Sequence, residues 1–222
     1  MKHKLICFFF FLVLSSLAAC GSQESTSSAT SSEPHGSQPA EQMENGQKTA
    51  GTEGNREDTK ILVAYFSVTG KTKALATFAA DAMGADLYEI APEDPYTSED
   101  LDYGNNDSRS AMEQSDESTR PAISGRVDNM EQYTVVFLGY PIWWGEAPRI
   151  INAFMESYDF SGMTLVPFCT SDSSPIGSSA QNLHDLAASN VNWLDGERLS
   201  SHSTREDIVG WINGLGLDVT AE

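Results

Sequence analysis

The segment Ile61–Thr72 constrains the fold of this chain more than any other. It begins with an apolar run rich in β-branched and aromatic residues, Ile61–Phe66, which is typical of a central parallel strand buried on both faces. A short turn with hydroxyl side chains and one glycine follows, and then a helical pattern of apolar residues that Gly84 ends. A buried strand that leads through a polar turn into a helix predicts an α/β fold built on a parallel sheet.

The turn Ser67–Thr72 has the chemistry of a phosphate site. The first N–H groups of a helix lack intrahelical partners and carry the positive end of the helix dipole, and the hydroxyls of the turn can complete the shell. Two nucleotide motifs are absent: a P-loop needs a second glycine where Tyr65 stands, and the dinucleotide fingerprint needs three glycines where only Gly70 is present. A hydroxyl-capped turn that binds no ligand is the alternative for this segment.

The N-terminal segment has the pattern of an export signal. Lys2 and Lys4 precede about ten apolar residues, and small residues lead to Cys20. The apolar stretch is too short for a transmembrane helix, which needs about 20 residues. The Leu-Ala-Ala-Cys ending resembles a bacterial lipobox, which implies that residues 1–19 are a lipoprotein signal peptide and that Cys20 is lipidated. The alternative is an ordinary cleaved signal with a chance cysteine. We therefore expect an extracytoplasmic protein, lipid-anchored to the bacterial cell membrane.

Composition divides the rest of the chain in two. Residues 20–59 are rich in Ser, Thr, Gly, Gln and Glu and have almost no large apolar side chains, so we predict a disordered tether. Residues 60–222 make one domain of ordinary size with enough apolar residues for a core. With Cys7 removed and Cys20 lipidated, Cys169 is the one remaining cysteine, so no intramolecular disulfide is expected, and Cys169 is predicted to be a buried small hydrophobe.

The chain is strongly acidic. Its net charge is −19, which becomes −21 when residues 1–19 and their two lysines are removed. Such a charge excludes nucleic acid as a partner and disfavours adsorption to anionic headgroups. It favours a redox partner with a basic docking surface, or it serves only to keep the protein soluble. No group of histidines and cysteines has the spacing of a metal site, so no metal is expected.

The remaining domain alternates between strands and helices. A long polar connection, Pro92–Pro121, interrupts this alternation after the second predicted strand. Further strands are predicted at 85–90, 134–140, 163–169 and, weakly, 192–199, and helices at 109–117, 149–158, 177–188 and 204–215. The alternation of apolar strands with helices predicts a parallel sheet covered on both faces.

Three loops follow the predicted carboxyl ends of central strands, where ligands bind in sheets of this kind. They are the turn 67–72, the segment Pro141–Pro148 and the serine-rich segment Thr170–Gly177. Trp143 and Trp144 of the second loop can cover a flat ring by offset stacking, worth about 0.5–1.5 kcal/mol beyond burial, or they can plug the top of the core. The third loop offers amides and hydroxyls for the polar edge of a planar heterocycle, with Asp172 as an acceptor or as a nearby negative charge.

Taken together, the loops resemble those of the flavodoxin family, specifically a bacterial short-chain group with a PIWWG loop. The matching stretches are YFSVTGKT, GYPIWWGEAPR and PFCTSDSSPIGSS, and the similarity runs from about Lys60 to Leu217. The resemblance implies an α/β, flavodoxin-like three-layer sandwich with a five-stranded parallel sheet of order 2-1-3-4-5, non-covalently bound FMN and electron transfer. Carried over by position, it implies a phosphate site of Ser67, Thr69, Gly70, Lys71 and Thr72, a ring site of Pro141, Ile142, Trp143, Trp144 and Gly145, and a second ring edge of Thr170, Ser171, Asp172 and Gly177.

The chain departs from the family pattern at two places. Lys71 stands where the family commonly has a neutral Asn, so a cation either touches the phosphate or points to solvent. The third loop has no aromatic residue, which leaves one face of the ring open unless Tyr96 or Tyr103 of the long connection covers it.

The leading hypothesis is an exported, lipid-anchored FMN protein that carries electrons. An FMN-dependent NAD(P)H:quinone-type reductase that uses the open ring face is one alternative, and a binding lipoprotein of the same fold without flavin is another. A hydrolase is disfavoured because there is no Gly-x-Ser-x-Gly elbow, and because His184 and Asp185 are neighbours in a predicted helix, where such side chains diverge. No catalytic residue is therefore assigned.

Overall fold

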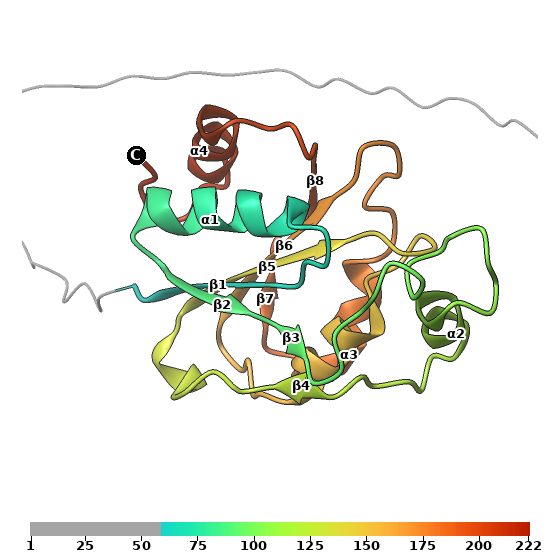
Figure 1. Ribbon diagram of the computed structural model, residues 1–222. Coiled ribbons are helices and arrows are strands. Elements are labelled where there is room, and N and C mark those ends of the chain that lie inside the picture. Colours follow the sequence, from blue (N-terminus) through green and yellow to red (C-terminus); the bar gives the residue numbers. More distant parts are fainter. Residues whose placement is uncertain (1–58) are drawn as a thin grey trace, which may run out of the picture. The chain divides into compact units, whose positions relative to one another are not determined.

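The computed structural model describes residues 59–222 (Figure 1). The predicted signal peptide, the predicted lipidation site Cys20 and all but the last residue of the predicted tether lie outside the described residues. Within the described part, no helix combines the length and the apolar character that crossing a bilayer requires.

A parallel sheet forms the centre of the domain. Its order is β2-β1-β5-β6-β7, with a further short strand, β8, also paired with β6. The strands are β1 (Ile61–Tyr65), β2 (Asp86–Glu89), β5 (Val135–Pro141), β6 (Thr164–Thr170), β7 (Asn192–Trp193) and β8 (Glu197–Leu199). All pairs in this sheet are parallel, which confirms the predicted α/β class and the order 2-1-3-4-5.

Helices cover both faces of the sheet (Figure 1). The helices α1 (Lys71–Met83) and α4 (Arg205–Gly214) pack on one face, and α3 (Arg149–Glu156) packs on the other. Consecutive residues of β1 alternate between the two cores: Leu62 faces the α3 side and Val63 faces α1 and α4. All five residues of β1 are buried, as expected for a strand covered on both sides.

The central strand β5 carries a glycine, Gly139, beside the neighbouring strand β6. This residue pairs with Phe168 in the parallel register. A Cβ atom added at Gly139 would lie 2.3 Å from Cζ of Phe168, a fully buried side chain. The absence of a side chain at Gly139 therefore makes room for a large aromatic ring in the core.

Two predicted elements differ in the structure. The fifth strand is split into β7 and β8, because the chain leaves the ladder around Gly196, where an added Cβ would lie 2.6 Å from Cδ1 of Ile176. Residues 177–188 do not form the predicted α-helix but contain a 3₁₀ helix, η2 (Gln181–Leu186). The Ser179 hydroxyl donates to the carbonyl of Ile176 at 2.7 Å, a local bond that competes with regular helix hydrogen bonding.

The long connection after β2 has structure of its own. Its ends are joined by an antiparallel pair of two-residue strands, β3 (Ala91–Pro92) and β4 (Ile123–Ser124), which the sequence pattern does not predict. Between them lies α2 (Arg109–Ser115), near the predicted 109–117 helix. A 3₁₀ turn, η1 (Met130–Gln132), precedes β5.

Candidate functional site

The carboxyl ends of the central strands surround a cavity of about 570 Å³. This volume lies in the range of small-molecule sites, about 300–1,000 Å³. The loops after β1, β5 and β6 all contribute to its lining, so the structure brings the three predicted loops together. The predicted residues that line it are Ser67, Thr69, Lys71, Thr72, Pro141, Ile142, Trp143, Trp144, Gly145, Thr170, Ser171 and Asp172.

Two predicted site residues, Gly70 and Gly177, do not line the cavity. Gly70 is the N-cap of α1 and has a φ of 82°, a left-handed conformation that side-chain-bearing residues rarely adopt. Gly177 has a φ of 56° and sits at the end of the third loop. Both glycines therefore shape the backbone of the site without lining the cavity.

The turn before α1 has hydrogen-bond donors without acceptors. The Oγ atom of Ser67 is buried and has no hydrogen-bond partner within the described residues. Gly70 has no side chain to cap α1, so the first N–H groups of the helix are open to an external acceptor. Thr72 Oγ1 lies 2.7 Å from Thr170 Oγ1, and because only one hydroxyl donates to the other, the second keeps its proton for another acceptor. An anion would satisfy these groups.

Lys71 is solvent-exposed, but its ammonium has a counter-charge. Its Nζ lies 2.9 Å from Oδ2 of Asp172, an ion pair that joins the turn to the third loop. The hydroxyl of Ser201 donates to Oδ1 of Asp172 at 2.6 Å. The Ser201 hydroxyl and then the Lys71 ammonium lower the pKa of Asp172 to about 2, so this carboxylate is ionised throughout the physiological range.

The two tryptophans of the second loop have different environments. Trp143 is 2% exposed and packs edge-on against Phe66 and Tyr96, with ring centroids 5.4 and 5.2 Å away. Trp144 is 43% exposed. Trp143 therefore plugs the core, and Trp144 is the tryptophan whose ring a planar ligand can reach.

The backbone at Trp144 is strained. Its φ is 48° and that of Gly145 is 85°. The N–H of Trp143 donates to the carbonyl of Glu146 at 2.9 Å, and the N–H of Glu146 donates to the carbonyl of Trp143 at 3.0 Å. Two left-handed residues closed by such a pair form a type I′ turn. A bulky residue in this conformation costs of order 1–3 kcal/mol, and such strain is concentrated at ligand sites.

The long connection braces this loop. Gln114 of α2 is buried, and its Nε2 donates to the carbonyls of Trp143 at 3.0 Å and Ala147 at 3.2 Å. Its Oε1 accepts from the backbone N–H of Arg149 at 3.1 Å. The side-chain amide of Gln114 thus fixes both ends of the turn that presents Trp144.

Of the two tyrosines expected to cover the site, only Tyr103 lines the cavity. Its ring centroid lies 5.1 Å from that of Trp144, with the planes tilted by 45°. Tyr96 lies beneath Trp143, with the Arg109 guanidinium 4.1 Å from its ring centroid. Leu101 and Ser201 also line the cavity and were missed from the sequence. Ser201 follows β8, so the rule that ligands bind beyond strand ends could have found it, whereas no pattern marks Leu101.

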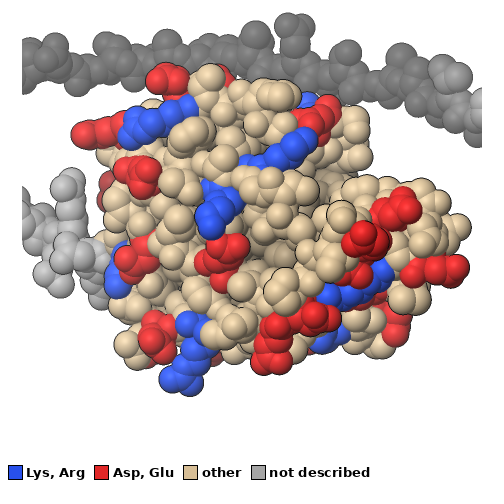
Figure 2. Space-filling view, in the orientation of Figure 1, with Lys and Arg blue, Asp and Glu red and all other residues tan. Residues whose placement is uncertain are grey.

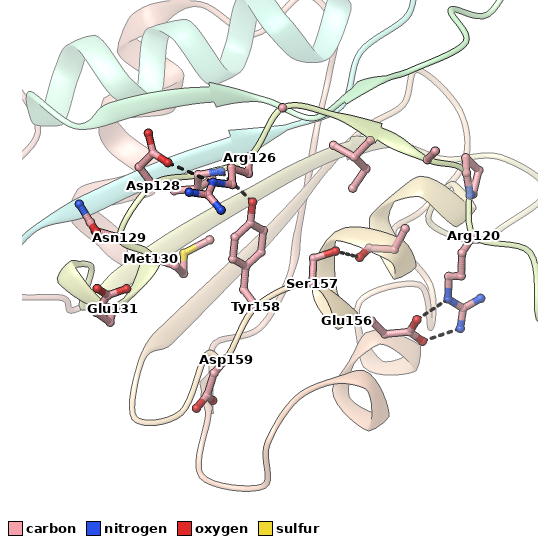
Figure 3. Close-up of a pocket in the computed structure, with 16 residues that line it drawn as sticks. Arg120, Arg126, Asp128, Asn129, Met130, Glu131, Glu156, Ser157, Tyr158 and Asp159 are labelled. Carbon is pink, nitrogen blue, oxygen red and sulfur yellow. Dashed lines mark hydrogen bonds and ion pairs between the residues drawn. The ribbon is translucent and has the colours of Figure 1, made fainter.

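A larger hollow of about 790 Å³ lies elsewhere, between residues 120–131 and 153–159 (Figure 3). Several of its charged and polar groups are paired with one another. Arg120 bonds Glu156 through two nitrogens at 2.7 and 2.8 Å, Arg126 pairs with Asp128, and the N–H of Val127 donates to the Tyr158 hydroxyl at 2.7 Å. None of the buried, unpartnered side-chain polar atoms of the described residues belongs to the lining of this hollow. Among residues 59–222 no cluster of His, Cys, Asp and Glu could hold a metal ion.

Comparisons with known proteins agree with this geometry. A family model described as flavodoxin matches residues 60–215. A crystal structure from Bacteroides eggerthii, of a protein assigned as a flavoprotein, is 46% identical with a TM-score of 0.68, covering 72% of this chain and 100% of the other. A similarly assigned protein from Bacteroides uniformis is 42% identical with a TM-score of 0.66, covering 70% and 98%. No curated protein matches the chain.

A more distant neighbour comes from Lactobacillus acidophilus. This flavoprotein, crystallised in complex with FMN, is 18% identical with a TM-score of 0.51, and the match covers 72% of this chain and 99% of the other. A similarity at this level of identity shows that the fold is shared.

Proposed function

Because the chain belongs to the flavodoxin family, we propose that it binds FMN without a covalent bond and carries electrons between redox partners. The observation that carries the proposal is the buried, unpartnered hydroxyl of Ser67 beside the uncapped start of α1. A phosphate supplies the acceptors that these donors lack. The FMN-bound flavoprotein of Lactobacillus acidophilus shares the fold, which supports the same cofactor here.

The residues around the cavity fit the parts of FMN. The hydroxyls of Ser67, Thr69 and Thr72 and the first amides of α1 would hold the phosphate. Trp144 would stack on the ring, with Trp143 supporting its loop from below. The loop after β6, with Thr170, Ser171 and Asp172, would meet the polar edge of the ring. FMN, when bound, supplies the ability to accept and release electrons.

The side chains that line the cavity favour an electron carrier over an acid–base enzyme. A general acid or base works best with a pKa near the operating pH. The pKa of Asp172 is lowered to about 2 by Ser201 and Lys71, and burial raises the pKa of Tyr103 above its usual value. Lys71 is held in an ion pair with Asp172. Asp172 and Tyr103 can bind and orient a flavin, but neither is a proton donor or acceptor poised near neutrality.

The function is tested by adding flavins to the purified protein. We expect FMN to bind with a shifted absorption spectrum, and riboflavin, which lacks the phosphate, to bind far more weakly. Titrations followed by absorbance and flavin fluorescence give both dissociation constants. Equal affinity for FMN and riboflavin would remove the phosphate assignment. A protein that takes up neither flavin would instead be a flavin-free binding protein of this fold.

An acidic surface beside the site supports a basic redox partner. Residues 93–117 contain nine Asp and Glu residues and one basic residue, Arg109. Figure 2 shows acidic side chains gathered on the α2 side of the molecule. The same segment contains Tyr103, so the negative surface reaches the cavity. A partner with a basic patch would be steered to this side, and its association rate would fall as salt is added. The same charge disfavours nucleic acid.

Membrane attachment through Cys20 is part of the proposal. Protein purified from the membrane fraction is expected to begin at Cys20 and to carry extra mass from attached lipid. Intact mass spectrometry measures both features. Cys20→Ala should remove the lipid mass, whereas the matched variant Cys169→Ala, at a fully buried position, should keep it. An unmodified Cys20 in the wild-type protein would rule out the anchor.

A further inference from the structure

Lys71, the first residue of α1, forms an ion pair with Asp172, another residue that lines the cavity. Lys71 Nζ and Asp172 Oδ2 lie 2.9 Å apart, and their side chains are 56% and 48% exposed. Asp172 is also held by Ser201, whose hydroxyl and N–H donate to Oδ1 at 2.6 and 3.3 Å. All three residues line the cavity.

An anion in the turn must compete with Asp172 for this ammonium. A lysine ammonium is a compact charge on a flexible stem and can exchange partners, and a solvent-exposed ion pair is worth little. The two serine bonds hold the carboxylate in place independently of the lysine. No other side-chain carboxylate lies within ion-pair distance of Lys71 among the described residues. Asp172 thus decides how much of the Lys71 charge reaches the turn.

We propose that Asp172 is a specificity-determining residue that acts through Lys71. By keeping the ammonium in an ion pair, it leaves the phosphate to the neutral hydroxyl and amide donors and limits the preference for FMN over riboflavin. This inference rests on the proposed function and assigns a role to a lysine where the family pattern has a neutral side chain.

A double-mutant cycle tests the role of the pair. Asp172→Asn frees the lysine, and FMN affinity is expected to rise about five-fold, the scale of one exposed charge a few ångströms away. The affinity should also become more sensitive to salt, because a free cation now faces the phosphate. Because Asp172 also borders the ring edge, riboflavin is the reference ligand, and the ratio of FMN affinity to riboflavin affinity should rise about five-fold as well. Lys71→Met alone should change FMN affinity by less than about two-fold, because the ammonium contributes little while it is paired.

The double variant separates two explanations of the gain. If Asp172 acts through Lys71, the gain of Asp172→Asn disappears when Lys71→Met is added. If the gain survives in the double variant, direct repulsion between the carboxylate and the phosphate is the cause, and the proposal is wrong. It is also wrong if Asp172→Asn binds FMN like the wild type.

A neighbouring ion pair provides the control. Lys73, also in the first turn of α1, lies 3.0 Å from Glu89, with side chains 55% and 42% exposed, but neither residue lines the cavity. Lys73→Met and Glu89→Gln should leave the affinities for FMN and riboflavin unchanged. If the wild-type protein fails to bind FMN at all, both the proposed function and this inference fall. If it binds FMN and the cycle shows no coupling, only the inference falls.

Discussion

Ser67→Ala should weaken FMN binding about ten- to hundred-fold while leaving the free energy of unfolding unchanged or slightly higher. A hydrogen bond to a charged group is worth about 1.5–3 kcal/mol, which sets the expected loss of affinity. The Ser67 hydroxyl is buried without a partner in the ligand-free protein, so its removal breaks no existing bond. Opposite effects on binding and on stability would identify a group kept for a ligand. Flavin titration and urea denaturation of the ligand-free protein measure the two quantities.

Ser108→Ala is the matched control for this prediction. The Oγ atom of Ser108 is also buried without a partner, but Ser108 precedes α2 and does not line the cavity. It should behave like Ser67→Ala in denaturation and like the wild type in FMN binding. Riboflavin, which has no phosphate, should bind Ser67→Ala and the wild type alike. If Ser67→Ala retained full affinity for FMN, the turn would not be the phosphate site.

Gly139→Ala is expected to destabilise the domain by about 1–3 kcal/mol or more, the usual cost of overpacking a core. The added methyl group would lie 2.3, 2.7 and 2.9 Å from three ring carbons of Phe168. Gly139 lies in a central strand between β1 and β6, so neither backbone can move away without disturbing the sheet. Each kcal/mol should lower Tm by about 2–4 °C in a protein of this size. Thermal and urea denaturation of the flavin-free protein measure the loss.

Two further variants check the cause of this loss. Gly210→Ala, on an exposed position of α4 with open space around it, should stabilise the domain by about 0.5–1 kcal/mol, because a helical glycine is entropically unfavourable. Phe168→Leu combined with Gly139→Ala should lose less than the sum of the two single changes, since the smaller side chain makes room for the methyl group. Additive losses would mean that the contact with Phe168 is not the source of the strain.

The sheet was predictable because its central strands are continuous runs of apolar residues in the sequence. Residues 61–66 and 134–140 are buried almost throughout. A strand that is buried on both faces shows a continuous apolar run in the sequence instead of an alternation of apolar and polar residues. The helix α4 was predictable from the helical spacing of its apolar residues, and its start is fixed by a reciprocal capping box between Thr204 and Asp207. Cys169 is fully buried, as predicted, and burial raises the pKa of its thiol to about 12.

Elements set by distant contacts were not predictable in the same way. The pairs β3–β4 and β6–β8 involve two or three residues each, too few for a periodic pattern. The 3₁₀ form of η2 depends on a local hydroxyl bond that competes with the helix. For the two strand pairs the deciding contacts join segments that are far apart in the chain, and for η2 the deciding bond is local but leaves no trace in the apolar pattern.

The candidate site shows the same division. The three loops of the site could be found from the predicted ends of the strands. The Lys71–Asp172 ion pair could not, because it joins residues 101 positions apart and no local pattern marks it. The roles of Trp143 and Trp144 depend on the type I′ turn, which sends neighbouring side chains in different directions. Gln114 has no sequence signature as a brace, because its partners are backbone carbonyls of another loop.

The β3–β4 pair has a consequence for how relatives of this protein can diverge. It brings the two ends of the connection together, so that residues 93–122 leave the sheet and return to the same place. Insertions and deletions within this excursion can therefore be tolerated without altering the spacing of the parallel strands. Partner choice can then evolve in the exposed parts of this segment, while the bracing contacts of Gln114 and the parallel sheet are inherited unchanged.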